Sequence, residues 1–421
     1  MKVLLVGGGG REHALAWRIA ESPLVDVLYA APGNPGIARH ARCVPMTVED
    51  HEAIVDLAAR ERMDLTVIGP EVPLVAGLWD RLAARGLAAV GPSAAAARIE
   101  GSKAFAKDLM KRHGIPTARF AIFTDPAAAR AYGRELGAPL VVKADGLAAG
   151  KGAIVCHTSV DVDEAIAACM ERRAFGAAGG TVVVEEFLRG EELSFFVVAN
   201  GADVVPLAAA QDHKTVFDGD RGPNTGGMGA YSPVGRVDDA LARRIMETIV
   251  VPTIRALGAE GAPYRGVLYA GLMLTADGPK VIEFNCRFGD PECQAILASA
   301  DGDLVPLLLA AARGEALPAP VPASRHAVCI TLASGGYPGA YRTGLPIDGL
   351  DAAEARDGVR VFHAGTALRD GKLVTAGGRV LGVTAVAGDL RTAIARAYAA
   401  VGDIGFEGMH FRRDIGEKGL G

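Results

Sequence analysis

Apolar runs typical of buried strands alternate with helical patterns through the first hundred residues. The run 2–6 leads into four glycines at 7–10 and then into a helical pattern over 11–20. Further apolar runs lie at residues 25–30, 65–69 and 87–91. Strands and helices that alternate in this way predict a doubly wound parallel sheet. We expect this first domain to span residues 1–101.

The middle of the chain mixes shorter helices and strands. A helical pattern over 103–111 is broken by Gly114 and Pro116, because glycine and proline stop helix propagation. A small α+β unit is predicted to follow, over about residues 120–190. Its expected strands are 140–143, 152–156 and 181–185, and its expected helices are 126–136 and 162–170. Strand-forming segments then dominate up to Asn285.

The proline-rich passage Leu317–Pro322 marks the last linker. We therefore expect a second domain over residues 102–325 and a third over 326–421. The third should contain strands at 327–332, 359–363 and 380–386 and a helix at 389–401. The predicted fold class is multidomain α/β and α+β, with a Rossmann-like N-terminal sheet, a central domain and a small C-terminal α+β domain.

Composition and charge exclude some classes of function. The chain has 421 residues, a net charge of -5 and six cysteines without a C-x-x-C pair. A pI near 6.0 gives no electrostatic case for nucleic acid. No apolar run is long enough for a membrane span, and the N-terminal run lacks the length and cleavage site of a signal peptide. We expect a cytoplasmic protein whose partners are small molecules, with no nucleic acid and no membrane among them.

The strand-like run Val281–Arg287 is the most informative stretch for chemistry. Alternation places Glu283, Asn285 and Arg287 on one face and packs the other face. A carboxylate, an amide oxygen and a guanidinium suit a hard divalent cation that holds phosphate oxygens. The alternative is a strand with a solvated face whose charges pair at little net gain. The glycine-rich segment upstream favours the functional interpretation.

That segment runs from Lys143 through Gly146, Gly150, Lys151 and Gly152. It is not a Walker loop, because a glycine replaces the metal-binding hydroxyl and strands rather than a helix flank it. It fits a flexible hairpin that closes over a triphosphate. Lys143 ends an apolar strand, where an unpaired ammonium is costly and a phosphate partner removes the cost. The alternative is that Lys143 reaches solvent.

Four more segments are candidates for ligand contact. Residues 185–188 leave a strand and could offer backbone groups to a flat base, with Glu192 beyond them at the ribose, although acidic loop residues are usually just solvated. Residues 211–214 and 222–232 are polar and glycine-rich, which lets a ligand approach the backbone. The 7–10 turn is not a dinucleotide fingerprint, because Glu12 stands where the third glycine should fall. It remains a good anion site or a structural turn.

In order and type, these parts resemble the ATP-grasp superfamily and, within it, the phosphoribosylamine-glycine ligase (glycinamide ribonucleotide synthetase) family. The resemblance covers essentially the whole chain. Its motifs are Gly7–Ala14, Gly101–Ala106, Lys143–Gly152, Gln211–Pro233, Glu283–Glu292, Gly377–Thr384 and Phe406–Met409. It implies that ATP phosphorylates the carboxylate of glycine and that 5-phospho-β-D-ribosylamine then displaces phosphate, an early step of de novo purine synthesis.

The resemblance also implies residue roles. ATP contacts would come from Lys103, Lys143, Gly146, Gly150, Lys151, Gly152, Glu185, Glu186, Phe187, Leu188 and Glu192. Glycine and phosphoribosylamine would meet Gly8, Gly9, Glu12, Gly33, Asn34, Asp212, Lys214, Asn224, Thr225, Gly226, Gly227 and Met228. Mg²⁺ or Mn²⁺ would bind Glu283 and Asn285, and catalysis would use Arg287, Lys143 and Asp212. The unit at 120–190 would be a mobile lid on an ATP-grasp domain, in a monomer.

Two other functions stay open from the residues alone. One is an ATP-dependent carboxylase that acts on bicarbonate with the same fold, although the 211–214 and 224–231 segments argue against it. The other is a nucleotide-binding module without turnover. The complete set of lysines, hairpin and metal ligands favours an active enzyme.

Overall fold

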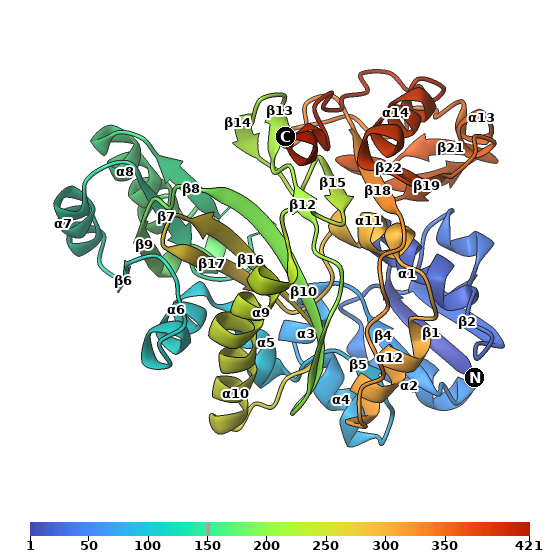
Figure 1. Cartoon of the computed structure of the whole chain (residues 1–421), viewed down its shortest axis with the longest axis horizontal. Coiled ribbons are helices and arrows are strands. Elements are labelled where there is room, and N and C mark those ends of the chain that lie inside the picture. The colour runs from blue at the N-terminus through green and yellow to red at the C-terminus, as the bar shows by residue number, and fades with distance from the viewer. Residues whose placement is uncertain (149–151) are drawn as a thin grey trace.

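The computed structural model describes residues 1–148 and 152–421. Its first part is the expected doubly wound domain, built on a parallel sheet with strand order β3-β2-β1-β4-β5. The strands are β1 (Lys2–Gly7), β2 (Val27–Pro32), β3 (Arg42–Cys43), β4 (Leu65–Ile68) and β5 (Ala89–Val90). The helices are α1 (Gly10–Ala20), α2 (His51–Glu61), α3 (Glu71–Val75), α4 (Leu78–Ala84) and α5 (Ala94–Gly101). The apolar runs therefore predicted the N-terminal fold (Figure 1).

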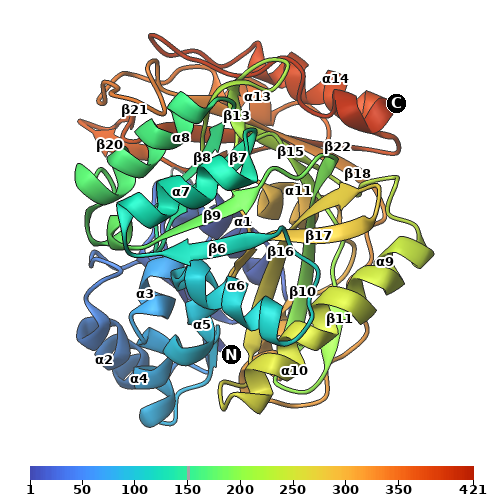
Figure 2. The ribbon, with the colours of Figure 1, turned by 90° about the vertical axis from the view of Figure 1, so that its left-hand side faces the viewer.

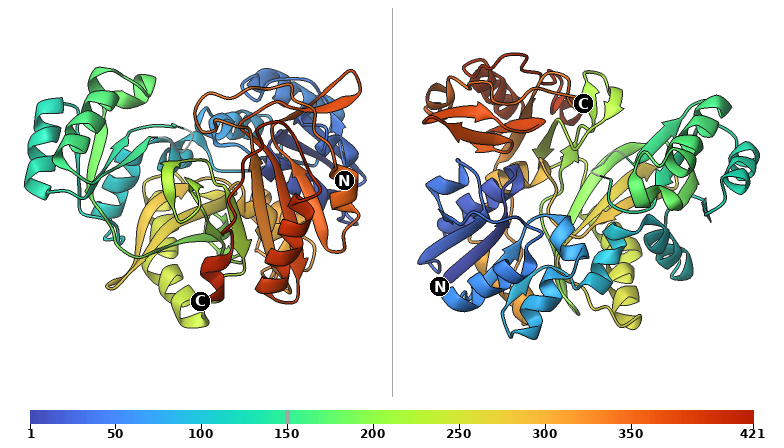
Figure 3. Two further views of the ribbon diagram at one scale, coloured as in Figure 1. Left: turned by 90° about the horizontal axis from the view of Figure 1, so that it is seen from above. Right: turned by 180° about the vertical axis from the view of Figure 1, so that it is seen from behind.

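A small α+β unit follows, and we call its antiparallel sheet, in the order β6-β9-β7-β8, the lid sheet. Its strands are β6 (Phe120–Phe123), β7 (Leu140–Ala144), β8 (Ala153–Cys156) and β9 (Val182–Glu186). The helices are α6 (Lys103–Arg112), which precedes it, α7 (Pro126–Leu136) and α8 (Ser159–Ile166). Figure 2 shows α7 and α8 covering one face of the sheet. Seen from above, the unit projects away from the N- and C-terminal parts (Figure 3).

A second antiparallel sheet, in the order β11-β10-β16-β17, faces the lid sheet, and we call it the base sheet. Its strands are β10 (Glu191–Asn200), β11 (Val204–Pro206), β16 (Arg265–Thr275) and β17 (Gly278–Asn285). The helices of this part are α9 (Asp239–Ile245), α10 (Val251–Ala259), α11 (Glu292–Ser299) and α12 (Val305–Arg313). Glu283, Asn285 and Arg287 line the cleft and Cys286 does not, as the alternation predicted. Phe284, expected on the packed face, is buried but also borders the cleft. A register shift beside Gly271 brings Ile282 to the cleft side as well.

The C-terminal sheet, in the order β12-β15-β18-β22-β19, recruits strands from the middle of the chain. Its strands are β12 (Gln211–Asp212), β15 (Gly229–Ser232), β18 (His326–Ala333), β19 (Val359–His363) and β22 (Arg379–Ala387). Two hairpins are β13 (Thr215–Phe217) with β14 (Arg221–Asn224) and β20 (Thr366–Arg369) with β21 (Lys372–Thr375); the helices are α13 (Leu350–Glu354) and α14 (Leu390–Val401). The glycine-rich segment 211–232 is thus anchored in this sheet. The domain boundaries at residues 101 and 325 stay predictions.

None of the helices in the described ranges combines the length and the apolarity that crossing a bilayer requires.

Candidate functional site

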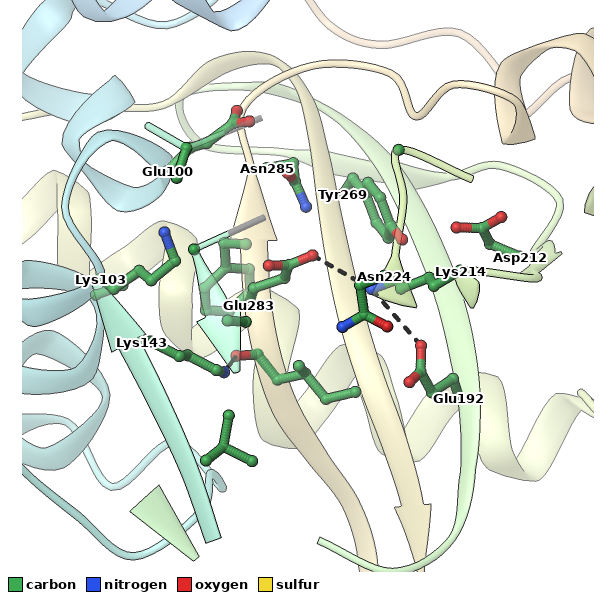
Figure 4. A pocket seen from close by; sticks show the side chains of 18 of the residues that line it. Glu100, Lys103, Lys143, Glu192, Asp212, Lys214, Asn224, Tyr269, Glu283 and Asn285 are labelled. Atoms are coloured by element: carbon green, nitrogen blue, oxygen red, sulfur yellow. Dashed lines mark hydrogen bonds and ion pairs between the residues drawn. The ribbon is translucent and has the colours of Figure 1, made fainter. Parts of the chain in front are cut away.

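A cleft of about 520 Å³ lies between the lid sheet and the base sheet. This volume is within the range of small-molecule sites. Its charged lining comes from Arg11, Glu71, Glu100, Lys103, Lys107, Lys143, Glu185, Glu186, Glu192, Asp212, Lys214, Glu283, Arg287, Asp290, Glu292 and Arg379. Figure 4 shows Lys143 of the lid sheet and Glu192 and Glu283 of the base sheet in this cleft, with Lys103 from α6 and Lys214 from the segment after β12.

The three polar side chains of the 281–287 segment meet in this cleft, as the strand pattern predicted. Lys214 Nζ lies 3.4 Å from Glu283 Oε1 and lowers the pKa of Glu283 to about 2, so this carboxylate is ionised at neutral pH. Asn285 Oδ1 accepts a hydrogen bond from Arg287 Nη2 at 3.2 Å. Asn285 Nδ2 is buried and has no hydrogen-bond partner among the described residues.

Arg287 is more constrained than the sequence suggested. Its Nε lies 2.9 Å from Glu71 Oε2, and its Nη2 lies 2.9 Å from Glu100 Oε1. Both acids belong to helices of the N-terminal domain, α3 and α5. Two carboxylates therefore orient the Arg287 guanidinium on the wall of the cleft.

The Lys143 ammonium contacts two partners, and neither contact was predicted from the sequence. The ammonium forms an ion pair with Glu185 Oε1 and donates to Ile282 O at 2.9 Å. Glu185 Oε2 forms an ion pair with Lys107. Both carboxylate oxygens of Glu185 are thus paired with lysines. Residues 186–188 also line the cleft, where they could contact a base.

The glycine hairpin is described at its two ends. Gly146 and Gly152 line the cleft, and Lys103 Nζ donates to Gly146 O at 2.9 Å. Gly146 has φ +117°, a conformation that favours glycine. The predictions for Gly150 and Lys151 lie outside the described residues.

Lys214 joins two of the predicted ligand-binding acids. Besides Glu283, its ammonium lies 3.6 Å from Glu192 Oε2 (Figure 4). Burial would lower the pKa of Lys214, but Glu283 and Glu192 outweigh it and raise that pKa well above its ordinary value. Lys214 is therefore a fixed positive charge between the position predicted for the ribose and the position predicted for the metal.

Asp212 and Glu292 form a buried pair of acids beside Tyr269, all three on the cleft wall. Burial and the nearby Glu292 carboxylate raise the pKa of Asp212 well above its ordinary value. Ser194 Oγ lies 2.9 Å from Tyr269 Oη and 3.3 Å from Glu292 Oε1. Sequence reasoning missed Glu292 as a site residue, although it ends one of the family motifs. Two carboxylates here favour a cationic ligand group.

Only part of the glycine-rich segment 222–232 lines the cleft. Asn224, Thr225 and Gly226 line it. Gly227, with φ +112°, lies behind Asp212, where a Cβ would come within 2.9 Å of Asp212 Oδ1. The side chain of Met228 is fully buried in a small apolar cluster, so the structure does not bring it to the cleft.

The N-terminal turn also lies off the wall of the cleft. Glu12 Oε2 accepts a hydrogen bond from the Gly9 N–H at 2.7 Å, and Glu12 Oε1 pairs with Arg11 Nε at 2.6 Å. Asn34 Nδ2 donates to Gly8 O and to His363 O, which ties this turn to β19. Gly8, Gly9, Glu12, Gly33 and Asn34 are not among the residues lining the cleft, whereas Arg11 is. Their predicted substrate contacts stay predictions.

The residues present fit a hard divalent cation. Glu283 supplies an ionised carboxylate and Asn285 an amide oxygen on the same cleft wall, the ligand types that Mg²⁺ and Mn²⁺ accept. Within residues 1–148 and 152–421, no group of three or more His, Cys, Asp and Glu could hold a metal ion. A cation would therefore take its other ligands from substrate and water.

Known proteins match the chain over its whole length. The Phosphoribosylglycinamide synthetase models match at residues 1–100 (N domain), 101–293 (ATP-grasp domain) and 327–418 (C domain). Phosphoribosylamine--glycine ligases from Rhizobium meliloti (strain 1021) and Agrobacterium fabrum (strain C58) are each 54% identical, over 100% of this chain and 99% of the relative.

Solved structures agree. A Phosphoribosylamine--glycine ligase from Thermotoga maritima superposes with a TM-score of 0.87 at 35% identity, covering 98% of this chain and 100% of that one. A biotin carboxylase from Campylobacter jejuni has a TM-score of 0.76 at 17% identity, covering 97% and 92%. The second likeness shows the shared fold alone.

Proposed function

The chain belongs to the phosphoribosylglycinamide synthetase family, and we propose that the cleft between its lid and base sheets is where it joins glycine to 5-phosphoribosylamine. The overall activity is that of a phosphoribosylamine-glycine ligase of purine biosynthesis. The assignment of individual residues rests on the geometry of the cleft.

One observation carries this placement: the ionised Glu283, four lysines and the ends of the glycine hairpin converge in one cavity. The triphosphate of ATP would lie near Lys103, Lys143 and Gly146, since ammonium groups and backbone N–H groups balance its charge. The adenine would lie against residues 186–188, and Glu192 would accept hydrogen bonds from the ribose hydroxyls.

The cation predicted here is Mg²⁺ or Mn²⁺, held by Glu283 and Asn285. When bound, it would neutralise phosphate oxygens and orient them for in-line transfer.

The chemistry needs no covalent nucleophile from the protein. A carboxylate oxygen of glycine attacks the γ-phosphorus, the bond to ADP breaks, and glycyl phosphate forms. The neutral amine of phosphoribosylamine then attacks the acyl carbon, phosphate leaves, and the amine loses a proton. Lys143 and Arg287 would balance charge on the transferring group, and closure of the lid unit would protect the acyl phosphate from water.

Asp212 and Glu292 mark the place of glycine. A glycine ammonium between them would compensate two buried carboxylates, which are costly when no cation is near. Its carboxylate would then point toward Asn285 Nδ2 and the phosphate end of the cleft. Asn224, Thr225, Gly226 and Arg379 form a further part of the wall, which we assign to phosphoribosylamine.

Labelled oxygen tests the reaction. Glycine carrying ¹⁸O in its carboxylate should transfer one label to orthophosphate when ATP and freshly generated phosphoribosylamine are supplied. A parallel reaction with bicarbonate in place of glycine should release no ADP. Turnover with bicarbonate, or unlabelled phosphate from labelled glycine, would contradict the proposal.

We also propose a cytoplasmic monomer. All six cysteines are free, which fits a reducing compartment. Sedimentation analysis of the active enzyme tests the monomer.

A further inference from the structure

The carboxylate of Glu185 is shared by two lysines that come from different parts of the fold. Lys143 belongs to the lid sheet, as does Glu185, whereas Lys107 belongs to α6, which precedes that sheet. Glu185 Oε1 pairs with Lys143 and Glu185 Oε2 with Lys107. All three side chains are at most 5% exposed.

These ion pairs lie on a chain of contacts that starts and ends on β17. Thr117 Oγ1 donates to Val281 O at 2.7 Å and accepts from Lys107 Nζ at 2.8 Å. The chain continues through Glu185 to Lys143, whose ammonium donates to Ile282 O. Two consecutive carbonyls of the base sheet, directly before Glu283, are thus joined through Lys107 to the lid sheet.

Lys107 lines the cleft, but its side chain is only 3% exposed and its ammonium is surrounded by protein groups. Its ammonium is enclosed by Glu185, by Thr117 and by the ring of Phe120, whose centroid lies 5.6 Å away. Burial is the main reason that the pKa of Lys107 falls to about 8. An ammonium kept there at this cost needs a role in the cluster itself.

We propose that Lys107 is a positioning residue for ATP: it keeps the Glu185 carboxylate paired, so that the Lys143 ammonium is free to bind a phosphate oxygen. This inference rests on the proposed placement of ATP in the cleft. Without Lys107, Glu185 would have Lys143 as its single cationic partner among the described residues. The Glu185 carboxylate and the nucleotide phosphate would then compete for the Lys143 ammonium, because an unpaired buried carboxylate is costly.

Calorimetric titration with ATP and Mg²⁺, without glycine, tests the proposal. Lys107→Met keeps the apolar stem and removes the charge, and it should weaken ATP binding roughly tenfold to a hundredfold, the loss expected for one charge-assisted hydrogen bond. KM for ATP should rise in parallel while KM for glycine stays unchanged. Lys111→Met, at an exposed position of the same helix, is the matched control and should bind as the wild type does.

A double variant separates positioning from direct contact. If Lys107 acts through Glu185, then Lys107→Met combined with Glu185→Gln should recover much of the lost affinity, since Lys143 no longer has a carboxylate to neutralise. A direct phosphate contact predicts no recovery. Thr117→Val removes the hydrogen bond that Thr117 accepts from Lys107 and leaves the charge in place, so it should also weaken ATP binding, but by less. This variant keeps the proposal testable if Lys107→Met fails to fold.

The inference is overturned if Lys107→Met and Thr117→Val bind ATP as Lys111→Met does, or if the double variant is no better than Lys107→Met. Its failure is distinct from that of the proposed function. Loss of glycine-dependent ADP release in the wild type would contradict the function, whereas the ATP titration needs no turnover.

Discussion

Glu283 and Lys214 lie 3.4 Å apart on the base-sheet side of the cleft, so an ionised carboxylate and a permanent ammonium face the same ligand. This pairing explains how Glu283 can stay charged in a largely enclosed site. It also means that a divalent cation must share Glu283 with a resident lysine. In the proposed placement of ATP, charge balance at this point would decide whether the triphosphate is held.

Glu283→Ala tests that balance. We expect kcat/KM for ligation to fall by roughly a hundredfold or more, because a group that stabilises transferring phosphate is lost. The fold should be kept, since Lys214 retains Glu192 as a partner. ADP release and the thermal unfolding midpoint measure the two effects. Asp277→Ala, an exposed acid in the turn before β17, is the control and should change neither; wild-type turnover by Glu283→Ala would refute the metal assignment.

Glu292→Gln tests the place of glycine. We expect KM for glycine to rise roughly tenfold to a hundredfold, because an ion pair to the ammonium becomes a neutral contact, while KM for ATP is unchanged. Discrimination against glycolate, which has a hydroxyl in place of the ammonium, should shrink. Steady-state ADP release with each acid measures both. Glu247→Gln, at an exposed helical position, is the control. A rise in KM for phosphoribosylamine alone would place the other substrate at Glu292.

Gly227→Ala tests the support of Asp212. Gly227 has φ +112°, and an added Cβ would lie 2.4 Å from Pro291 Cδ and 2.9 Å from Asp212 Oδ1. We expect a loss of stability of about 1–3 kcal/mol from strain and a lower kcat with glycine, because the carboxylate must move. Thermal unfolding and ADP release provide the measurements. Gly235→Ala, where a Cβ meets nothing within 4 Å, should behave as the wild type.

The sequence revealed those parts of the fold whose pattern is local. The apolar runs of the N-terminal sheet and the helix at 126–136 were predicted within a few residues, because periodic burial fixes such elements. Strands β12 and β15 were not predicted as members of the C-terminal sheet. They are two and four residues long and lie in a glycine-rich segment, so they carry no periodic signal.

The residues of the site also fall into two groups: those that a local pattern predicts and those that only the folded structure brings together. Glu283, Asn285 and Arg287 share a strand face, which alternation alone predicts. Lys107 and Glu100 are charged residues in helices, and such residues are most often solvated. Their partners, Glu185 and Arg287, are distant in the sequence, so these pairs appear only when helix and sheet are brought together.

Two buried histidines predict how stability depends on pH. Burial lowers the pKa of His213 to about 4 and that of His363 to about 4, against about 6.5 in an unfolded chain. Between these values the unfolded chain binds more protons than the folded one, so the free energy of unfolding falls as pH falls. Each histidine should cost roughly 3 kcal/mol across this window.

His363→Gln isolates one of these contributions. The variant should be less stable at pH 7, because the contact between the His363 imidazole and Thr366 is disturbed, yet its unfolding midpoint should fall less between pH 6.5 and 4 than that of the wild type. Glu283, Glu71 and Asp414 have pKa values near 2, so their pairs are lost mainly below that window. His157→Gln, at an exposed position, should keep the wild-type pH dependence. Equal slopes for His363→Gln and the wild type would show that His363 does not resist protonation in the folded state.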